Sequence, residues 1–292
     1  MSPHFNEWLE LALRWAHVFA GILWVGATFY FTWLDGCFEE LAKAPEKPGE
    51  KKLVWMVHSG GFYAVEKQKV PTVLPGTLHW FKWEAAFTWI TGLLLFGLVY
   101  WHGKLLTSVE ETAADRWATL FPNCAAPGWL TPALGFLTDH YLVVSFGLIL
   151  VGWAVYDLLW GKIFKHDAAG VVISFLLVVA CVLFSCIAFP GRGAYLQAGT
   201  MFGTLMAANV WMRILPAQRR MVAALKAGQS PNLEEGARAK ARSKHNTFIV
   251  LPVVFTMIST HYPGTYGSRY NWIILSALVL VGWVAAKVIR RA

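Results

Sequence analysis

Seven long apolar segments constrain the fold of this chain more than any other feature of its sequence. Each approaches the length that an α-helix needs to cross a bilayer, although the sixth is short. Backbone N–H and C=O groups inside hydrocarbon must pair within the protein, so such segments form helices rather than open strands. We therefore expect an all-α polytopic membrane bundle of about seven transmembrane helices, in which residues 1–292 make one integral membrane domain. The segments are Trp8–Leu34, Glu84–Trp101, Leu134–Trp160, Ala168–Phe189, Tyr195–Leu215, Asn246–His261 and Trp272–Ile289.

The composition agrees with a membrane protein, since 57% of the 292 residues are apolar and only 14% are charged. The four cysteines show no paired spacing, which argues against a disulfide framework or a zinc site. There is no Cys-x-x-Cys-His motif, so we expect no covalently attached haem. The N-terminus has Glu7 and Glu10 but no basic region or cleavage site, so we expect the first apolar segment to be retained as a helix.

The basic residues predict the orientation of the bundle. Seven lysines precede the second segment and seven arginines and lysines precede the sixth, with further basic residues after the third segment and at the C-terminus. The connections on the other side hold only Lys104, Arg116, Arg192 and Arg269. Positive residues gather on the cytoplasmic side of membrane proteins, so we expect the N-terminus outside and the C-terminus in the cytoplasm. The net charge of +8 then reflects topology, and we expect no nucleic-acid partner.

Three stretches lie outside the predicted helices. Residues 35–83 are a cytoplasmic loop with a Gly pair and many aromatic residues, which is typical of an ordered, functional loop. The alternative is a re-entrant or hairpin loop whose aromatic residues only mark the membrane interface. Residues 103–131, which contain acidic residues and prolines, are expected to form an outer cap. Residues 217–244 are expected to form a basic, helical cytoplasmic arm.

Candidate catalytic residues gather on the predicted cytoplasmic side. The loop and the start of the second helix supply His58, His79 and Glu84, and His245 opens the sixth helix. Asn209 lies near the inner end of the fifth helix, away from a stripe of small residues that is typical of close helix packing. Histidines and carboxylates move protons, aromatic rings stack on flat ligands, and amides pair with an amide or imide edge. The pattern predicts proton-coupled oxidation of a small, planar, electron-rich anion. Nearby lysines would attract it, although positive-inside topology alone explains them.

Three more histidines lie toward the predicted outer side. His17 and His140 are expected about two turns inside the first and third helices, and His261 at the outer end of the sixth. His17 shares a helix face with Gly21, and His140 with Gly147, which leaves room for a flat ring. This predicts haem b with His17 and His140 as axial ligands and His261 as a propionate partner or substitute ligand. The alternative is that the glycines serve packing and the histidines bridge helices by hydrogen bonds.

Six blocks of the sequence carry a further signal. They are Arg14–Gly26, His58–Tyr63, His79–Ala85, Gly199–Val210, Pro216–Arg219, and Ser243–Thr247 with its continuation through His261 to Pro263. Together they resemble the membrane domain of the bacterial membrane-bound urate oxidase family. The resemblance covers nearly the whole chain. It implies an enzyme of the bacterial inner membrane that oxidises urate to 5-hydroxyisourate, takes oxygen from water, and passes electrons to a c-type cytochrome.

Two features depart from the family pattern. The family's His-Gly-Gly-Gly loop has Ser59 as its second residue here, which can be tolerated or can change the pocket. The chain ends at Ala292, whereas in the family a further helix and a c-type cytochrome domain typically follow. We therefore expect a separate c-type cytochrome as partner, or a drift to another substrate or a purely electron-transfer role.

The resemblance and the residue types together assign roles. His58, His79 and Glu84 are expected to handle protons, and the purine is expected to be held by Gly60, Gly61, Phe62, Trp83, Asn209, His245 and Asn246. Two other functions stay open at this point. One is a b-type cytochrome subunit of a larger complex without urate chemistry, which urate would not reduce. The other is a transporter or channel for a planar anion, which would need no haem and would show uptake in vesicles.

Overall fold

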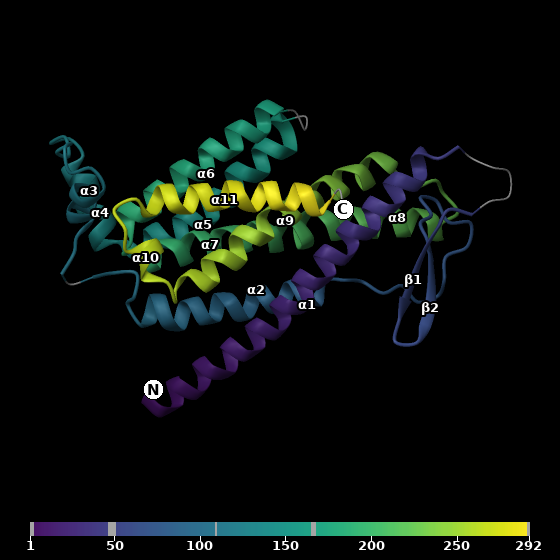
Figure 1. Ribbon diagram of the computed structural model, residues 1–292, viewed down its shortest axis with the longest axis horizontal. Helices are drawn as coiled ribbons and strands as arrows, with labels where there is room; N and C mark the ends of the chain where they lie inside the picture. Colours follow the sequence, from purple (N-terminus) through teal and green to yellow (C-terminus); the bar gives the residue numbers. More distant parts are fainter. Residues whose placement is uncertain (1–2, 46–50, 109, 165–167, 291–292) are drawn as a thin grey trace.

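The computed structural model of this protein describes residues 3–45, 51–108, 110–164 and 168–290. Long helices lie side by side along one axis, and a single hairpin stands at one end of the bundle (Figure 1). The predicted all-α class is therefore confirmed. Among the described residues, five helical segments are long and apolar enough to cross a membrane: Pro3–Lys43, Trp83–His102, Tyr141–Ile163, Ala168–Ala188 and Asn271–Ile289.

Helix α1 (Pro3–Lys43) runs diagonally across the bundle, from the labelled N-terminus toward the end that carries the hairpin (Figure 1). It packs mainly against α2 (Trp83–Phe96), which continues into the π-helical segment η1 (Gly97–His102). Large apolar side chains of α1, such as Trp15, Phe19 and Ile22, are exposed. In a bilayer these side chains would face lipid, which is why so much apolar surface is acceptable here.

The fifth and sixth predicted spans lie in the middle of the bundle. Helix α7 (Gly191–Ala208) is buried along most of its length and packs against α9 (Leu233–Ser259). A Cβ at Gly199 would come within 2.2 Å of the hydroxyl of Thr256, so the small-residue stripe does bring these helices close at that position. Protein surrounds most of α7, so this helix can carry polar residues such as Gln197 inside the bundle.

Several predicted helix boundaries are wrong, among them both ends of α1, which was expected over Trp8–Leu34 and runs over Pro3–Lys43. The sixth span was expected to begin near Asn246, but α9 is one helix from Leu233, because Asn232 caps its start by accepting from the backbone N–H groups of Glu234 and Glu235. Most of the basic arm is therefore helix, made of α8 (Leu215–Lys226) and the first turns of α9. Gly228, with φ of 70°, lies in the turn between them.

The third span is also divided. Helix α4 (Thr131–Asp139) stops, and α5 (Tyr141–Leu158) restarts after His140, whose φ and ψ of −117° and 34° are not helical. Helix α5 then continues into the π-helical segment η2 (Leu159–Ile163). His140 is consequently at a helix junction and is exposed, rather than two turns inside one helix. The remaining helices are α6 (Ala168–Ala188), α10 (Pro263–Tyr266) and α11 (Asn271–Ile289).

The predicted outer cap contains α3 (Ala113–Leu120). The buried Arg116 donates from Nε to the carbonyl oxygen of Ile187 (2.8 Å) and from Nη2 to that of Ala188 (2.9 Å), which fixes the cap to the end of α6. In Figure 1, α3 and α4 lie at one end of the molecule, whereas α8 and the hairpin lie at the other. The two ends match the predicted separation of cap and arm, and which end faces the cytoplasm stays a prediction.

The hairpin occupies the predicted loop. Strand β1 (Leu53–His58) pairs antiparallel with β2 (Gly61–Glu66), and β-branched and aromatic residues make up half of each strand. The connecting residues Ser59 and Gly60 have φ of 49° and 75°. Positive φ at both positions is the geometry of a type I′ turn, which favours glycine or asparagine. Ser59 therefore occupies a position where glycine would be less strained.

Candidate functional site

The structure separates the predicted inner residues into three places: the hairpin turn, the start of α2 and a buried cluster between α5, η3 (Asn209–Ile214) and α9. The hairpin turn carries His58, Gly60, Gly61 and Phe62. The Phe62 side chain is 81% exposed, and His58 is exposed as well. The strands contact α1, where the Tyr30 hydroxyl lies 3.5 Å from the Met56 sulfur. Within the described part of the chain, no hydrogen bond or ring contact joins this turn to the buried cluster.

The start of α2 lies between α1 and η3. The exposed ring of His79 contacts Phe81 edge-on, with 4.5 Å between centroids, and Phe81 contacts Phe31 of α1. Glu84 lies in the first turn of α2, where a carboxylate is favourable because the helix dipole is positive there. Trp83 meets Trp211 of η3 with 5.9 Å between centroids. Aromatic contact thus connects the start of α2 to η3, the segment that contains Asn209 of the buried cluster.

Asn209 is the centre of the buried cluster and has no exposed surface. Its Nδ2 donates to Oδ1 of Asn246 (2.9 Å) and to the hydroxyl of Tyr156 (2.9 Å). Nδ2 of Asn246 donates to the carbonyl oxygen of Met206 (3.0 Å), one turn before Asn209. The predicted pair Asn209 and Asn246 is therefore brought together, by η3 and α9.

His245 completes one edge of the cluster. Its Nδ1 lies 2.8 Å from the Tyr156 hydroxyl, and its ring contacts Trp160 edge-on with 4.4 Å between centroids. Tyr156 is on the last turn of α5 and Trp160 is in η2. π-Helical segments are rare and are often found at functional sites, and two of the three in the described residues, η2 and η3, border this cluster.

Three charged side chains form the other edge. Asp157 accepts from Nε of Arg213 (2.8 Å) and from Nη2 of Arg242 (3.0 Å), and a second bond joins it to Arg213. The Arg242 guanidinium also lies over the Tyr156 ring, 4.9 Å from its centroid. Two guanidinium groups thus face one carboxylate, so these three groups keep one unit of positive charge. A negatively charged ligand would balance it.

Two buried polar atoms of the cluster have no hydrogen-bond partner: Oδ1 of Asn209 and Nη1 of Arg242. A buried polar atom left unpaired costs about 1–3 kcal/mol, so native structures rarely keep one without a reason. One atom is an acceptor and the other a donor. The two atoms are thus chemically complementary to a group that donates and a group that accepts, respectively.

The three predicted outer histidines, His17, His140 and His261, do not form a cluster like the one around Asn209. Nδ1 of His17 donates to the carbonyl oxygen of Thr88 (2.9 Å), and the ring packs against Gly92 of α2. This is the helix-bridging arrangement that was the alternative to haem ligation. His140 stacks on Phe136 at the junction of α4 and α5, and His261 is exposed after the end of α9. Among the described residues, no group of three or more His, Cys, Asp or Glu side chains is arranged to hold a metal ion.

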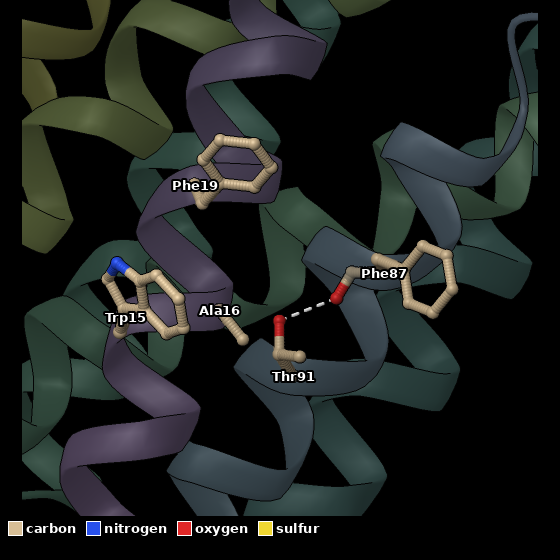
Figure 2. A pocket seen from close by; sticks show the side chains of 5 residues that line it. All are labelled: Trp15, Ala16, Phe19, Phe87 and Thr91. Carbon is tan, nitrogen blue, oxygen red and sulfur yellow. Dashed lines mark hydrogen bonds between the residues drawn. The ribbon is translucent and has the colours of Figure 1, made fainter.

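Two hollows lie away from the buried cluster. An apolar groove of about 320 Å³ runs between α1 and α2 and is lined by Trp15, Ala16, Phe19, Phe87 and Thr91. Figure 2 shows the Thr91 hydroxyl turned to the carbonyl oxygen of Phe87 rather than into the groove. A second hollow of about 300 Å³ is formed by α1 and the residues around η1. Neither is lined by a residue predicted to act on a substrate.

Comparison with protein families matches the chain to the model described as urate oxidase N-terminal, over residues 3–291. The chain belongs to the urate oxidase N-terminal family. Searches of curated proteins and of solved structures gave no match. Membership in this family confirms the resemblance drawn from the six sequence blocks and supports an oxidoreductase class for the protein.

Sequence reasoning missed three cluster residues of this urate oxidase family member: Tyr156, Asp157 and Arg242. Asp157 offered a usable signal, because an acidic residue near the end of an apolar helix is costly unless it is paired. Arg242 is three residues before His245, a spacing that places both on one helix face. That signal was hidden because α9 was expected to begin later. Tyr156 has no signal in the sequence that separates it from an interface tyrosine.

Proposed function

We propose that this protein oxidises urate to 5-hydroxyisourate in the bacterial inner membrane and passes the electrons, through haem b, to a c-type cytochrome. The observation that carries the proposal is that the family match spans residues 3–291 and includes a buried, positively charged amide cluster around Asn209. Urate is planar and anionic at neutral pH, and its edges alternate N–H donors with C=O acceptors. The cluster offers complementary groups in a site screened from water.

Recognition would rest on the amides and the guanidinium. Oδ1 of Asn209 would accept from a urate N–H, and Nη1 of Arg242 would donate to a urate oxygen, so both unpaired atoms would gain partners. The excess positive charge of Arg213 and Arg242 over Asp157 would balance the monoanion. His245 and Asn246 would complete this edge of the site.

The predicted proton-handling residues would approach from outside the cluster. Trp83, beside Glu84 and close to His79, already contacts Trp211 of η3. His58, with Gly60, Gly61 and Phe62, lies at the end of the hairpin, which stands at the same end of the molecule as α8 (Figure 1). In this proposal the turn would cover the substrate, because His58 and Phe62 are exposed rather than packed into the bundle.

His17 is the candidate haem ligand that the geometry supports best. Its Nδ1–H is engaged by the Thr88 carbonyl, which fixes the tautomer and leaves Nε2 as the nitrogen able to bind iron. His140 and His261 are exposed at helix ends and belong to elements other than α1. When bound, the haem would supply one-electron transfer.

Anaerobic reduction by urate tests the proposal. The purified protein is mixed with urate and oxidised cytochrome c without oxygen, and the visible spectra of the protein and of the acceptor are recorded. We expect urate-dependent reduction in the parent, and its loss in His79→Ala and Glu84→Ala with folding unchanged. A haem spectrum that urate leaves oxidised would favour an electron-transfer subunit instead. Absence of haem together with urate uptake into vesicles would favour a transporter.

A further inference from the structure

We infer that Tyr156 is a proton-relay residue, which passes a proton from the bound substrate to His245. The inference rests on the proposed function and adds a residue that the sequence did not reveal. It is carried by the direction of the hydrogen bonds in the buried cluster. That direction follows from one group, the backbone carbonyl of Met206, because a carbonyl can only accept.

The direction is fixed step by step. Nδ2 of Asn246 must be the atom that faces the Met206 carbonyl, at 3.0 Å, so Oδ1 of Asn246 faces Asn209. Asn209 must then present Nδ2 to that oxygen, and its second Nδ2 hydrogen points to the Tyr156 hydroxyl at 2.9 Å. The Tyr156 oxygen therefore accepts from Asn209. The Tyr156 hydroxyl has a hydrogen of its own, and the relay assigns that hydrogen to the 2.8 Å contact with Nδ1 of His245.

This arrangement requires a neutral His245. An imidazole nitrogen that accepts a hydrogen bond carries no proton, so Nδ1 is free of hydrogen and Nε2 carries it. His245 is consequently a base aimed at the phenol. The phenol oxygen receives a hydrogen bond from Asn209, and the Arg242 guanidinium lies 4.9 Å from the ring centroid. Both contacts favour negative charge on Tyr156 while its proton is moving.

Tyr156 lies nearer the surface of the cluster than its amide partners do. Asn209 and Asn246 are buried, whereas Tyr156 and His245 are half-buried. In the step itself, the substrate N–H bond breaks and a new O–H bond forms on Tyr156, while the original Tyr156 O–H breaks and Nδ1–H forms on His245. The step transfers protons only, and nothing is oxidised or reduced. The product is a deprotonated substrate, which is easier to oxidise, beside a His245 imidazolium.

The test compares Tyr156→Phe with a matched tyrosine. The control is Tyr195→Phe, because the fully buried Tyr195 donates to the carbonyl oxygen of Asn271 (2.6 Å) and takes no part in the cluster. Tyr156→Phe should slow urate turnover by about 100-fold or more, as expected for loss of a positioned proton-transfer group. Equilibrium urate binding should stay within a few-fold of the parent. Tyr195→Phe should keep parent turnover per folded molecule.

A second readout needs no turnover. In protein with ¹⁵N-labelled histidine, assigned through a His245→Gln variant, the parent His245 should show a protonated Nε2 and a hydrogen-bonded, unprotonated Nδ1. Tyr156→Phe should move the Nδ1 signal toward that of a nitrogen without a hydrogen bond. His245→Gln, which accepts a hydrogen bond but is not a base, should lose turnover even if Tyr156→Phe folds poorly.

The outcomes separate the two proposals. A parent that leaves urate unoxidised overturns the proposed function, and the relay toward urate with it. A parent that oxidises urate while Tyr156→Phe keeps the parent rate overturns the relay alone. A protonated Nδ1 on His245 in the parent also overturns the relay, whatever the substrate.

Discussion

Helix α5 is joined to the α7–η3 helix by buried polar groups at two levels along its length, one at Ser145 and one at Tyr156. The two levels differ in charge and in how completely their polar atoms are paired. At one level, Trp101 Nε1 donates to the Ser145 hydroxyl (2.9 Å), which donates to Oε1 of Gln197 (2.6 Å). Nε2 of Gln197 returns a bond to the Ser145 carbonyl oxygen (3.0 Å). At the other level, Tyr156 and Asn209 meet beside Asp157 and its two arginines.

The first network is neutral, and no side-chain oxygen or nitrogen of Ser145 or Gln197 is left without a partner. The second is charged and leaves Asn209 Oδ1 and Arg242 Nη1 unpaired. A network in which every polar atom has a hydrogen-bond partner holds helices together, and it has no free group that a ligand could pair with. A network with unpaired groups and excess charge is poised to bind one. Buried polar residues in the same helix pair therefore have two roles: helix packing at Ser145 and Gln197, and candidate ligand binding at Tyr156 and Asn209.

The largest expected effect is on activity at the second level. Asn209→Ala removes the donor to both Tyr156 and Asn246 and the acceptor proposed for urate. We expect urate-dependent reduction of cytochrome c to fall by about 100-fold or more, because the reacting groups lose their alignment. Initial rates per folded molecule measure this. A rate within about three-fold of the parent rate would show that the Asn209 network has no role in activity, since lost alignment is expected to cost about 100-fold.

A moderate effect on stability is expected at the first level. Gln197→Leu keeps the volume but leaves the Ser145 hydroxyl without its acceptor in the bundle interior. We expect the free energy of unfolding in detergent to fall by about 1–2 kcal/mol, near the range for buried polar contacts between membrane helices. Thermal unfolding followed by tryptophan fluorescence measures it. If turnover per folded molecule also collapsed, this network would not be purely structural.

The smallest effect is expected outside the bundle, at the capping box of α3. Asp115 accepts from the hydroxyl (2.7 Å) and the backbone N–H (2.8 Å) of Thr112, and these bonds hold the pKa of Asp115 below its ordinary value. A pKa lowered by folding adds stability above the unfolded value, about 3.9 for aspartate, and the gain is lost as pH falls through the folded value. Asp115→Asn should therefore speed amide exchange of residues 113–120 at neutral pH.

The difference between this variant and the parent should shrink as the solution is made more acid. A difference that grows below about pH 4 would contradict the capping role, since a protonated aspartate and the asparagine of the variant are nearly equivalent acceptors. Compared with the two buried networks, this site shows what an exposed, fully satisfied contact contributes: local order, without function.

The amino-acid sequence by itself determined the class of the protein and both ends of three helical segments, Trp83–His102, Ala168–Ala188 and Asn271–Ile289, to within one residue. Segments as apolar as Ala168–Ala188 can only be helices in a bilayer, because no water is there to pair with the backbone. The sequence also singled out Asn209 and Asn246, since their amides can pair with an amide or imide edge. It misplaced the break at His140 and the start of α9. Both depend on local caps and on packing that apolar periodicity does not record.

Only the tertiary structure decided which polar residues meet. His58 and Asn209 were equally good candidates in the sequence, yet one is exposed on a hairpin turn and the other is enclosed by three helical elements. Tyr156 became a candidate only because the rotation of α5 turns its hydroxyl between Asn209 and His245. The rotation is set by contacts along the whole helix, from residues far apart in the chain. Hydropathy reports how deep a residue lies, whereas side-chain hydrogen bonds depend on distance and direction, which only the packed helices fix.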